Sequence, residues 1–260
     1  MDVLKGYIDA AEKRMEEELA LARTIQESAL PKNFDFNHHS FEIYATMHPA
    51  RDVGGDFYDF FFIDSSRLAL VIADVSGKGI PAALYMMRSK TAIHGLAEVG
   101  ADLPDVFART NEALCQGNDA DMFVTVWMGI VDLDSGLIKC VNAGHEYPAI
   151  RHSGGDFELL KKKHGPPLGV MEGLKFTEYE IVLEPGDTLF VYTDGVPEAI
   201  NKAKEQYGTD RMLAALNKAG NCSMRKLLPA VRYDLNLFVG DEDQFDDVTM
   251  LGFFYRGSKD

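Results

Sequence analysis

Six aspartates in this chain stand at or beside positions where a strand-forming run of residues meets a turn. They are Asp56, Asp59, Asp74, Asp194, Asp246 and Asp247. Two glycines come directly before the first of them, and Gly195 follows Asp194, so the backbone at these turns can approach another group closely. A single aspartate in such a place is as easily a turn or helix cap as a ligand. The whole set is better explained by a shared chemical role.

Carboxylates that converge from several strand ends need a counter-charge. Without one they would repel each other, and their pKa values would rise. A pair of divalent cations removes this problem, and the lack of histidine or cysteine at ligand spacing favours Mg²⁺ or Mn²⁺ over zinc. Two such ions about 3.5–4 Å apart can lower the pKa of a shared water and direct it in line at phosphorus. The aspartates therefore predict a two-ion centre that hydrolyses a phosphoester.

Other reactive side chains in these turns fit structural roles better. Ser76 has no histidine and acid at the spacing of a catalytic triad, and it is interpreted as a turn serine. The segment SGKG at 76–79 lacks the spacing and the final Ser or Thr of a phosphate-binding P-loop. Lys78 in that segment is expected to be a solvated charge, although contact with a phosphoprotein stays open. His145, in NAGHEYP, is interpreted as structural because a pair of ions makes a histidine acid unnecessary.

The overall composition excludes several classes of function. Of 260 residues, 26 are Lys or Arg and 41 are Asp or Glu, which gives a formal net charge of −15. A surface this acidic repels phosphate backbones and anionic lipids, so no nucleic-acid partner is expected. No apolar run approaches the roughly 18 residues that span a membrane, so no membrane insertion is expected. Three scattered cysteines, Cys115, Cys140 and Cys222, indicate a reducing compartment, and a cytoplasmic location is expected.

Residues 2–30 form a segment rich in Ala, Glu, Leu, Lys and Arg that is typical of one helix ending before Pro31. Its apolar residues follow a heptad over about four repeats. The two seam positions hold Leu4, Ala11, Glu18 and Ile25, and Ile8, Met15, Ala22 and Ala29. Because three alanines and a glutamate bury little area, the seam is weak. Residues 1–31 are predicted to be a linker helix that pairs with a second copy or joins an upstream sensor, and a helix packed on its own domain is the alternative.

Residues 40–256 show the pattern of a second, larger unit with strands and paired helices. Strands are expected at 41–47, 67–73, 122–131, 137–142, 176–183, 188–193 and 248–255. Helices are expected at 81–99, 104–115, 209–218 and 224–238. The turn Asp134-Ser135-Gly136 joins two of the strands as a hairpin. Clustered strands and paired helices predict an α+β fold with antiparallel sheets flanked by helices.

Several segments of the chain together resemble one known family. They are ELALARTIQESALP (18–31), ARDVGGDFYDFF (50–61), ALVIADVSGKGIPAAL (69–84), FVTVWMGIVDLDSG (123–136), NAGHEYPAI (142–150), GPPLGV (165–170), GDTLFVYTDGVPEA (186–199) and FDDVTML (245–251). In this order they resemble the metal-dependent protein phosphatases of the protein phosphatase 2C superfamily (PPM), and within it the bacterial SpoIIE/RsbU branch. The resemblance implies a β-sandwich of two antiparallel sheets with α-helices on both outer faces.

The resemblance also implies roles for individual residues. Asp74 would bridge the two ions, with the backbone carbonyl of Val75 as a further ligand. Asp56 would bind or orient the second ion and its waters, and Asp194 would hold the first ion.

Further residues receive roles from the same resemblance. In FDDVT the family pattern selects Asp246 as the ligand and leaves the neighbouring Asp247 as a supporting residue. Asp59 is expected to support Asp56 or to cap a turn. Arg51 lies five residues before Asp56, a spacing that resembles that of the phosphate-binding arginine in eukaryotic relatives, and an ordinary surface arginine is the alternative.

The resemblance implies a serine/threonine protein phosphatase that depends on two Mn²⁺ or Mg²⁺ ions. It further implies a partner-switching pathway in which the substrate is a phosphorylated anti-sigma-factor antagonist with a STAS domain. Two other functions stay open, namely a catalytically weak scaffold that binds phosphoproteins and a metal hydrolase of a small phosphoester. The helix at 1–31 and the helices at roughly 81–116 resemble linker and switch elements, so pairing of the linker helices would set metal affinity.

Overall fold

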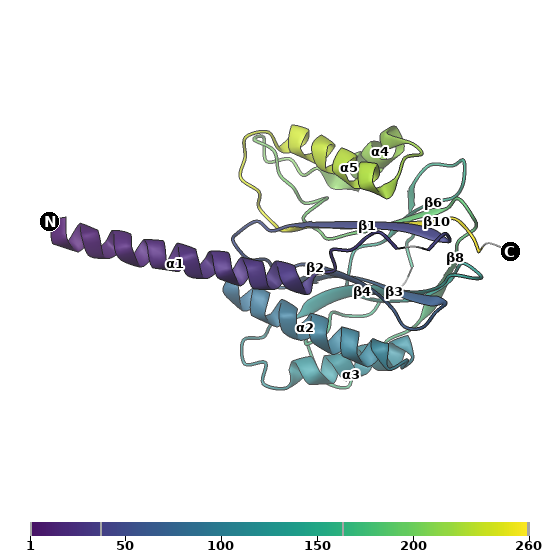
Figure 1. The fold of residues 1–260 in the computed structure, drawn as a ribbon, viewed down its shortest axis with the longest axis horizontal. Coiled ribbons are helices and arrows are strands. Elements are labelled where there is room, and N and C mark those ends of the chain that lie inside the picture. The colour runs from purple at the N-terminus through teal and green to yellow at the C-terminus, as the bar shows by residue number, and fades with distance from the viewer. Residues whose placement is uncertain (1, 37, 163, 259–260) are drawn as a thin grey trace.

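Strands after residue 40 build two five-stranded antiparallel sheets that stack face to face, with two helices on each outer side (Figure 1). The computed structural model describes residues 2–36, 38–162 and 164–258 of the chain. The predictions of an α+β fold and of a sandwich flanked by helices are confirmed. Among the described residues, no helix has both the length and the apolarity needed to span a bilayer.

One sheet, sheet A, pairs the first and the last strand of the domain. Its strands, in spatial order, are β1 (Phe41–His48), β10 (Val248–Tyr255), β9 (Thr188–Tyr192), β6 (Ala149–Arg151) and β7 (Glu158–Leu159). In the antiparallel register, His48 at the end of β1 lies opposite Val248 at the start of β10. The segment after β1 therefore lies beside the segment before β10, although about 200 residues of chain separate them.

The other sheet, sheet B, contains the strand of strongest β character. Its strands, in spatial order, are β2 (Phe57–Phe62), β3 (Arg67–Val75), β4 (Val124–Asp132), β5 (Leu137–Ala143) and β8 (Tyr179–Val182). β4 and β5 form the predicted hairpin, with Gly136 at a φ of +75°. A side chain at Gly136 would also place its Cβ 2.2 Å from the carbonyl oxygen of Leu183, so only glycine fits this turn.

Apolar residues of both sheets fill the space between them. Every residue of β3 from Leu68 to Ala73 is buried, as predicted for a strand covered on both faces. A second apolar cluster lies between sheet A and the helices on its outer side. Each large side chain that is buried in these layers contributes about 1.5–3 kcal/mol to folding, so the strand ends extend from a rigid scaffold.

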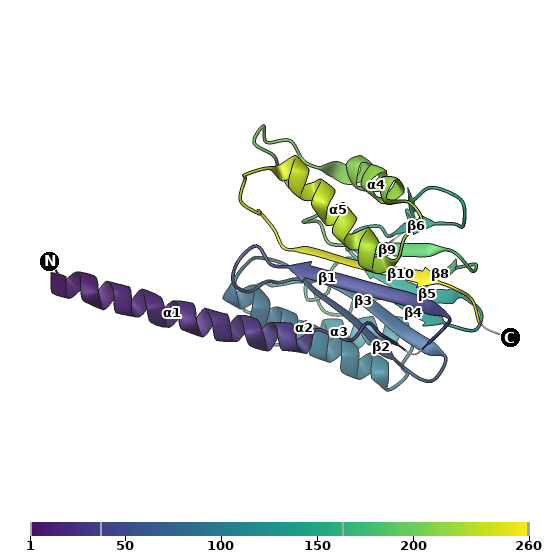
Figure 2. The ribbon, with the colours of Figure 1, turned by 45° about the horizontal axis from the view of Figure 1, so that its top comes forward.

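Four helices cover the outer faces of the sandwich (Figure 2). α2 (Ile80–Glu98) and α3 (Leu103–Cys115) pack on sheet B, and α4 (Gly208–Ala219) and α5 (Met224–Val239) pack on sheet A. All four begin and end within one residue of the predicted bounds. α2 has Pro81 in its first turn and starts five residues after β3 ends, which ties its position to the end of that strand.

The N-terminal helix α1 (Asp2–Ala29) projects away from the rest of the molecule (Figures 1 and 2). Leu4, Ile8 and Met15 of the predicted seam are 66%, 49% and 63% exposed. Burial begins near the C-terminal end of the helix, and Gln26 and Leu30 are buried there. The prediction of a single helix is confirmed, and most of its described length does not pack on its own domain.

Three strands were missed by the sequence analysis, and one is shorter than expected. β2 follows directly after two glycines and an aspartate, whose turn chemistry masks the strand pattern. β6 and β7 have only three and two residues, which is too short for a period to be recognised. The strand expected at 176–183 pairs only over β8, because Phe176 packs on Phe107 in α3, with 5.6 Å between ring centroids.

Candidate metal centre

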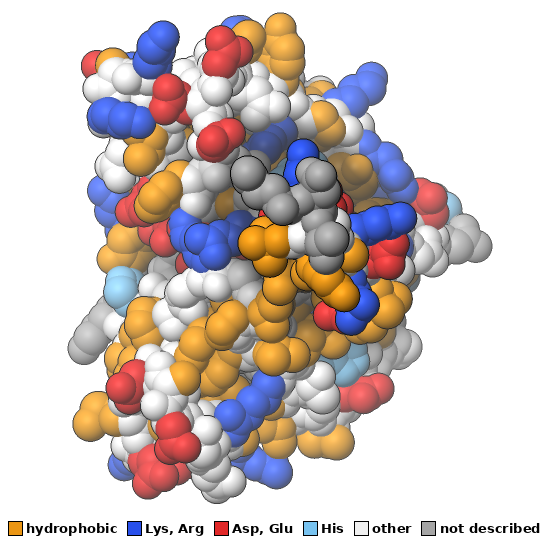
Figure 3. Space-filling model, turned by 90° about the vertical axis from the view of Figure 1, so that its left-hand side faces the viewer, with side chains coloured by type: hydrophobic (Ala, Val, Ile, Leu, Met, Phe, Trp, Pro, Cys, Tyr) orange, Lys and Arg blue, Asp and Glu red, His pale blue; other side chains and the backbone are white. Residues whose placement is uncertain are grey.

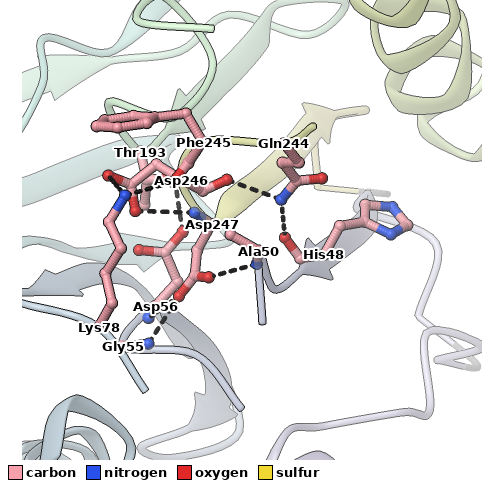
Figure 4. A network of polar contacts seen from close by, with 10 residues as sticks. All are labelled: His48, Ala50, Gly55, Asp56, Lys78, Thr193, Gln244, Phe245, Asp246 and Asp247. Atoms are coloured by element: carbon pink, nitrogen blue, oxygen red, sulfur yellow. Dashed lines mark hydrogen bonds and ion pairs between the residues drawn. The ribbon is translucent and has the colours of Figure 1, made fainter. Parts of the chain in front are cut away.

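The strand register brings five of the predicted aspartates to one end of the sandwich. Asp74 is the next-to-last residue of β3, and Asp56 precedes β2, which pairs with β3. Asp194 follows β9 by two residues, and Asp246 and Asp247 are the two residues before the neighbouring strand β10. Figure 4 shows Asp56, Asp246 and Asp247 close together, although they come from opposite ends of the chain. This convergence is what a shared ligand requires.

Burial and mutual repulsion raise the pKa values of these carboxyl groups. Asp56 is 1% exposed, and burial followed by the charges of Asp74 and Asp247 raises its pKa well above the usual range. Burial and the charges of Asp194 and Asp246 raise the pKa of Asp74 to about 8. Burial and the charge of Asp246 raise the pKa of Asp194 to about 6. The cluster can be fully ionised at neutral pH only if cations compensate it.

The donor set fits hydrated Mg²⁺ or Mn²⁺ ions. All of its side chains offer oxygen, and the carboxyl group of Asp56 is close enough to act on the pKa of Asp74. A Cβ on Gly55 would lie 2.9 Å from the carbonyl oxygen of Val75, so this backbone oxygen faces the loop that carries Asp56. Within the described parts of the chain, no three His, Cys, Asp or Glu side chains surround one point. Paired carboxylates nonetheless suit Mg²⁺, which commonly takes one or two carboxylates and keeps several waters.

Asp247 differs from its neighbour because backbone donors occupy both of its carboxylate oxygens (Figure 4). Its Oδ1 accepts a hydrogen bond from the amide of Ala50 at 2.7 Å, and its Oδ2 accepts from the amides of Gly55 at 2.7 Å and Asp56 at 3.3 Å. A Cβ on Gly54 would lie 2.4 Å from the same Oδ2, which explains the first glycine of the pair. Asp247 therefore holds the glycine loop in place.

Two hydrogen-bonding residues of the centre were missed by the sequence analysis. The Thr193 hydroxyl donates to Oδ2 of Asp56 at 2.7 Å. The Gln244 amide donates to the backbone oxygens of Asp246 and His48, both at 2.7 Å (Figure 4). Each stands one or two residues before a predicted ligand, and that position is the only sequence signal that could have found them.

A third missed residue, Gln26, connects α1 to the centre. Its side-chain amide is 4% exposed and pairs with the backbone of Gly54, with Nε2 donating to the carbonyl at 2.7 Å and Oε1 accepting from the amide at 3.0 Å. Gly54 lies two residues before Asp56. The last turn of the projecting helix is therefore attached to the loop that positions a candidate ligand.

Asp59 does not belong to the cluster, and the prediction that it supports Asp56 is wrong. Its Oδ2 accepts from Nζ of Lys90 at 2.6 Å and lies 2.8 Å from Nδ1 of His94, both on α2. The cause is strand alternation, because residues three apart on an extended segment point to opposite faces. Asp59 thus connects β2 with α2 rather than with the metal centre.

His145 and Ser76 have the structural surroundings that were expected. His145 is 5% exposed, and burial lowers its pKa to about 3, so the ring is neutral. Its Nδ1 lies 2.9 Å from Oγ1 of Thr125, which stands opposite Asp74 in the β3–β4 pair. Oγ of Ser76 accepts from the amide of Phe123 at 2.9 Å, as a turn serine does. Both residues brace the end of β3.

Residues 64–254 match the family model described as Stage II sporulation protein E (SpoIIE). The chain belongs to the SpoIIE family. It is 31% identical over 266 residues to Protein IcfG of Synechocystis sp. (strain ATCC 27184 / PCC 6803 / Kazusa), with 91% of this chain covered. It is 30% identical over 242 residues to Phosphoserine phosphatase RsbU of Bacillus subtilis (strain 168), with 92% of this chain covered. This SpoIIE-family chain spans 41% of the length of IcfG and 70% of that of RsbU.

The fold of this SpoIIE-family chain has solved counterparts. The SiaA-PP2C domain of Pseudomonas aeruginosa superposes with a TM-score of 0.82 at 24% sequence identity, covering 95% of this chain and 99% of that one. The likeness extends over both sheets and all four covering helices, because nearly the whole of each chain is matched.

Two cationic side chains lie at the rim of the SpoIIE-family centre. The expectation that Lys78 is a solvated charge is wrong, because its Nζ lies 2.9 Å from Oδ2 of Asp246 and 3.8 Å from the centroid of the Phe245 ring. Arg51 is exposed, and its guanidinium borders the turn after β3, where a Cβ on Gly79 would lie 3.5 Å from Nη1. Lys78 thus forms an ion pair with the candidate ligand Asp246, and Arg51 faces solvent at the turn beside it.

Replacing Lys78 with glutamine should tighten Mn²⁺ binding by roughly 3- to 10-fold, because the ammonium group no longer competes with the ion for Asp246. Calorimetric titration of the metal-free protein measures this affinity directly. Lys161→Gln, a matched change at an exposed lysine elsewhere, should leave the affinity unchanged. Weaker binding by the Lys78 variant would contradict the prediction.

Proposed function

We propose that this chain is a serine/threonine protein phosphatase that depends on Mn²⁺ or Mg²⁺. The observation that carries the proposal is the convergence of buried and half-buried aspartates from both sheets, whose raised pKa values indicate a need for bound cations. The family is metal-dependent in general, and one relative is named a phosphoserine phosphatase. When bound, two ions supply positive charge for the phosphoryl oxygens and a water of lowered pKa.

The roles proposed for the residues follow their positions. Asp74 is influenced by all the other carboxylates of the cluster and would bridge the two ions, with the carbonyl of Val75 beside it. Asp56 would hold one ion and its waters, and Thr193 fixes its carboxylate. Asp194 would hold the other ion.

The remaining roles concern the rim and support of the centre. Asp246 would complete the site of the ion at Asp194, since its charge is among the causes that raise the pKa of Asp194. Asp247 holds the glycine loop through three backbone amides. The exposed guanidinium of Arg51 can bind phosphate oxygens in a bidentate manner, which supports a role in holding the substrate.

A titration of Mn²⁺ with three substrates tests the proposed activity. Hydrolysis of p-nitrophenyl phosphate and of a phosphoserine peptide should rise from background with Mn²⁺ and should be abolished by a chelator. No hydrolysis of any substrate would favour the alternative of a phosphoprotein-binding scaffold. Hydrolysis of a nucleotide in preference to the phosphopeptide would favour a small-phosphoester hydrolase.

The partner in this proposal is a phosphorylated anti-sigma-factor antagonist with a STAS domain, in a partner-switching pathway. The similarity to RsbU supports it. The proposal places residues 40–256 as the phosphatase domain and residues 1–31 as a regulatory linker, in the cytoplasm. It is tested by comparing dephosphorylation of a purified phosphorylated STAS protein with that of a peptide cut from it, because a folded partner should be the better substrate by at least tenfold.

The exposed seam of α1 supports pairing with a second copy of the chain or with an upstream sensor. Figure 3 looks onto the end from which α1 projects and shows apolar side chains gathered around it. Leu4, Ile8 and Met15 of α1 are exposed large apolar residues. Because Gln26 is hydrogen-bonded to Gly54, a change in the position of the helix would shift the loop that carries Asp56.

Deleting residues 2–18 should abolish self-association and shift the Mn²⁺ concentration for half-maximal activity by at least about threefold. The deletion removes most of the exposed seam but keeps Gln26 and Leu30, which anchor the helix to the domain. Light scattering gives the mass, and the activity titration gives the metal dependence. The double variant Ile8→Glu, Met15→Glu keeps the helix length and should behave alike. If neither the mass nor the titration changes, the linker hypothesis fails.

A further inference from the structure

A groove of about 270 Å³ opens beside the candidate metal centre. The loop after β9, the last turns of α5 and the loop before β10 form it. Two of its lining residues are Gly195, which follows Asp194, and Asp246. Whatever occupies this groove therefore lies directly next to the group held at the centre.

Apolar side chains form part of the inner surface of the groove. Ile200, Leu235, Val239 and Phe245 line it. Leu235 is 1% exposed and forms the floor, whereas Phe245 is 60% exposed and stands at the edge towards the centre, where Lys78 lies over its ring (Figure 4). The volume is at the lower limit for a small-molecule pocket and suits a single long side chain.

Carboxylates dominate the mouth of the groove. Glu198, Glu242 and Asp243 line it in addition to Asp246. Among the described residues that line it, Arg232 is the one cation, and its Nη2 donates to Oε1 of Gln244 at 2.7 Å. Within the described parts of the chain, Glu198 and Asp243 take part in no ion pair, so their charges are available to a ligand.

We propose that this groove binds a lysine or arginine side chain of the phosphoprotein substrate, a few residues from its phosphorylated residue. The inference rests on the proposed phosphatase function and adds a determinant of substrate choice. The aliphatic stem of such a residue packs on an apolar floor while its cationic head reaches a carboxylate rim, which is the arrangement found here. An acidic or phosphorylated flanking residue would be repelled by the same rim.

A positional scan of phosphoserine peptides tests the proposal on the full chain with Mn²⁺. Each peptide is otherwise neutral and carries one arginine, or one citrulline of nearly equal shape, at a position from three before to three after the phosphoserine. At one or two positions arginine should raise kcat/KM at least about tenfold over citrulline, mainly through a lower KM. Ratios near one at every position would overturn the proposal.

Charge reversal at the rim identifies the groove as the cause. In the double variant Glu242→Lys, Asp243→Lys, the ratio of kcat/KM for the arginine peptide to kcat/KM for the citrulline peptide should fall below one at the preferred position. A peptide with glutamate there should become the best substrate. The ratio is taken within one enzyme, so changes in folding or metal loading cancel. Glu158→Gln, at an exposed position on β7, should keep the wild-type ratio. An unchanged ratio in the double variant would overturn the assignment to this groove.

The same assays distinguish failure of the groove proposal from failure of the proposed phosphatase function. If the wild type hydrolyses p-nitrophenyl phosphate with Mn²⁺ but gives a flat peptide scan, the phosphatase function stands and the groove proposal is overturned. If no phosphoester is hydrolysed at any Mn²⁺ concentration, the proposed function fails and the groove proposal fails with it.

Discussion

Replacing Asp74 with asparagine should lower Mn²⁺-dependent phosphatase activity by about three orders of magnitude or more while the protein stays folded. The charges of Asp194 and Asp246 and the neighbouring carboxyl of Asp56 all act on Asp74, which is why its carboxylate is the one proposed to contact both ions. A neutral amide offers a single weaker oxygen and removes the charge that two cations require. Asp194→Asn should lose activity to a similar degree.

The measurement is kcat/KM on a phosphoserine peptide at saturating Mn²⁺, with circular dichroism melting as the test of folding. Asp156→Asn, at an exposed position away from the cluster, serves as the matched control and should retain full activity. Activity of the Asp74 variant within about tenfold of wild type would mean that this carboxylate is not an ion ligand.

The same substitution should make the metal-free protein more stable at pH 8. The pKa of Asp74 is raised to about 8, from the value near 3.9 of an unfolded chain, by burial and by the neighbouring charges. A raised pKa means that the carboxyl contributes stability below about pH 4 and that this contribution is lost as the pH rises towards 8. The pKa of Asp194 is raised to about 6, so this carboxyl group also lowers the stability of the metal-free protein as the pH rises towards 6.

Urea unfolding in the presence of a chelator at pH 5 and pH 8 measures this effect. The free energy of unfolding of the wild type should fall by on the order of a few kcal/mol between the two pH values, and that of Asp74→Asn should fall less. Mn²⁺ binds the folded state and should therefore raise the free energy of unfolding of the wild type at pH 8. It should raise that of the variant much less. A metal-free variant less stable than wild type at pH 8 would contradict this account of the cluster.

Replacing Gly195 with alanine should destabilise the protein by roughly 2–4 kcal/mol and lower activity about 100-fold. A Cβ at this position would lie 1.8 Å from the backbone carbonyl oxygen of Asp247. That oxygen belongs to the residue before β10, which is fixed by its pairing with β9, so it cannot rotate away as a side-chain atom would. The strand ends would have to separate, and Asp194 would move away from Asp246.

A matched glycine distinguishes this clash from a general effect of alanine. Gly95 lies inside α2, and a Cβ there would have no atom within 4 Å apart from the helix backbone. Gly95→Ala should therefore stabilise the protein by about 0.5–1 kcal/mol, because alanine is the better helix former. Thermal melting of both variants and Mn²⁺-dependent activity test the pair. If Gly195→Ala melts and turns over like wild type, the close approach of the two strand ends is not real.

Local patterns in the sequence determined most elements of the fold and the candidate ligands. Apolar periodicity and turn residues depend on near neighbours, so the strands at 41–48, 67–75 and 248–255 and the four covering helices could be predicted from them. Asp74 was found for the same reason, since it ends a continuous apolar run. The α+β class followed from the order of these elements, and the sandwich from the order of the family's motifs.

The partners of the polar side chains were decided only by the tertiary structure. Asp247 bonds to Ala50 and Gly55, which are 197 and 192 residues away in the chain, and Gln26 bonds to Gly54. Lys78 was expected in solvent and instead pairs with Asp246. The physical reason is that a hydrogen bond needs its atoms within about 3 Å, and the register of two stacked sheets, not the neighbouring sequence, sets which backbone groups come that close.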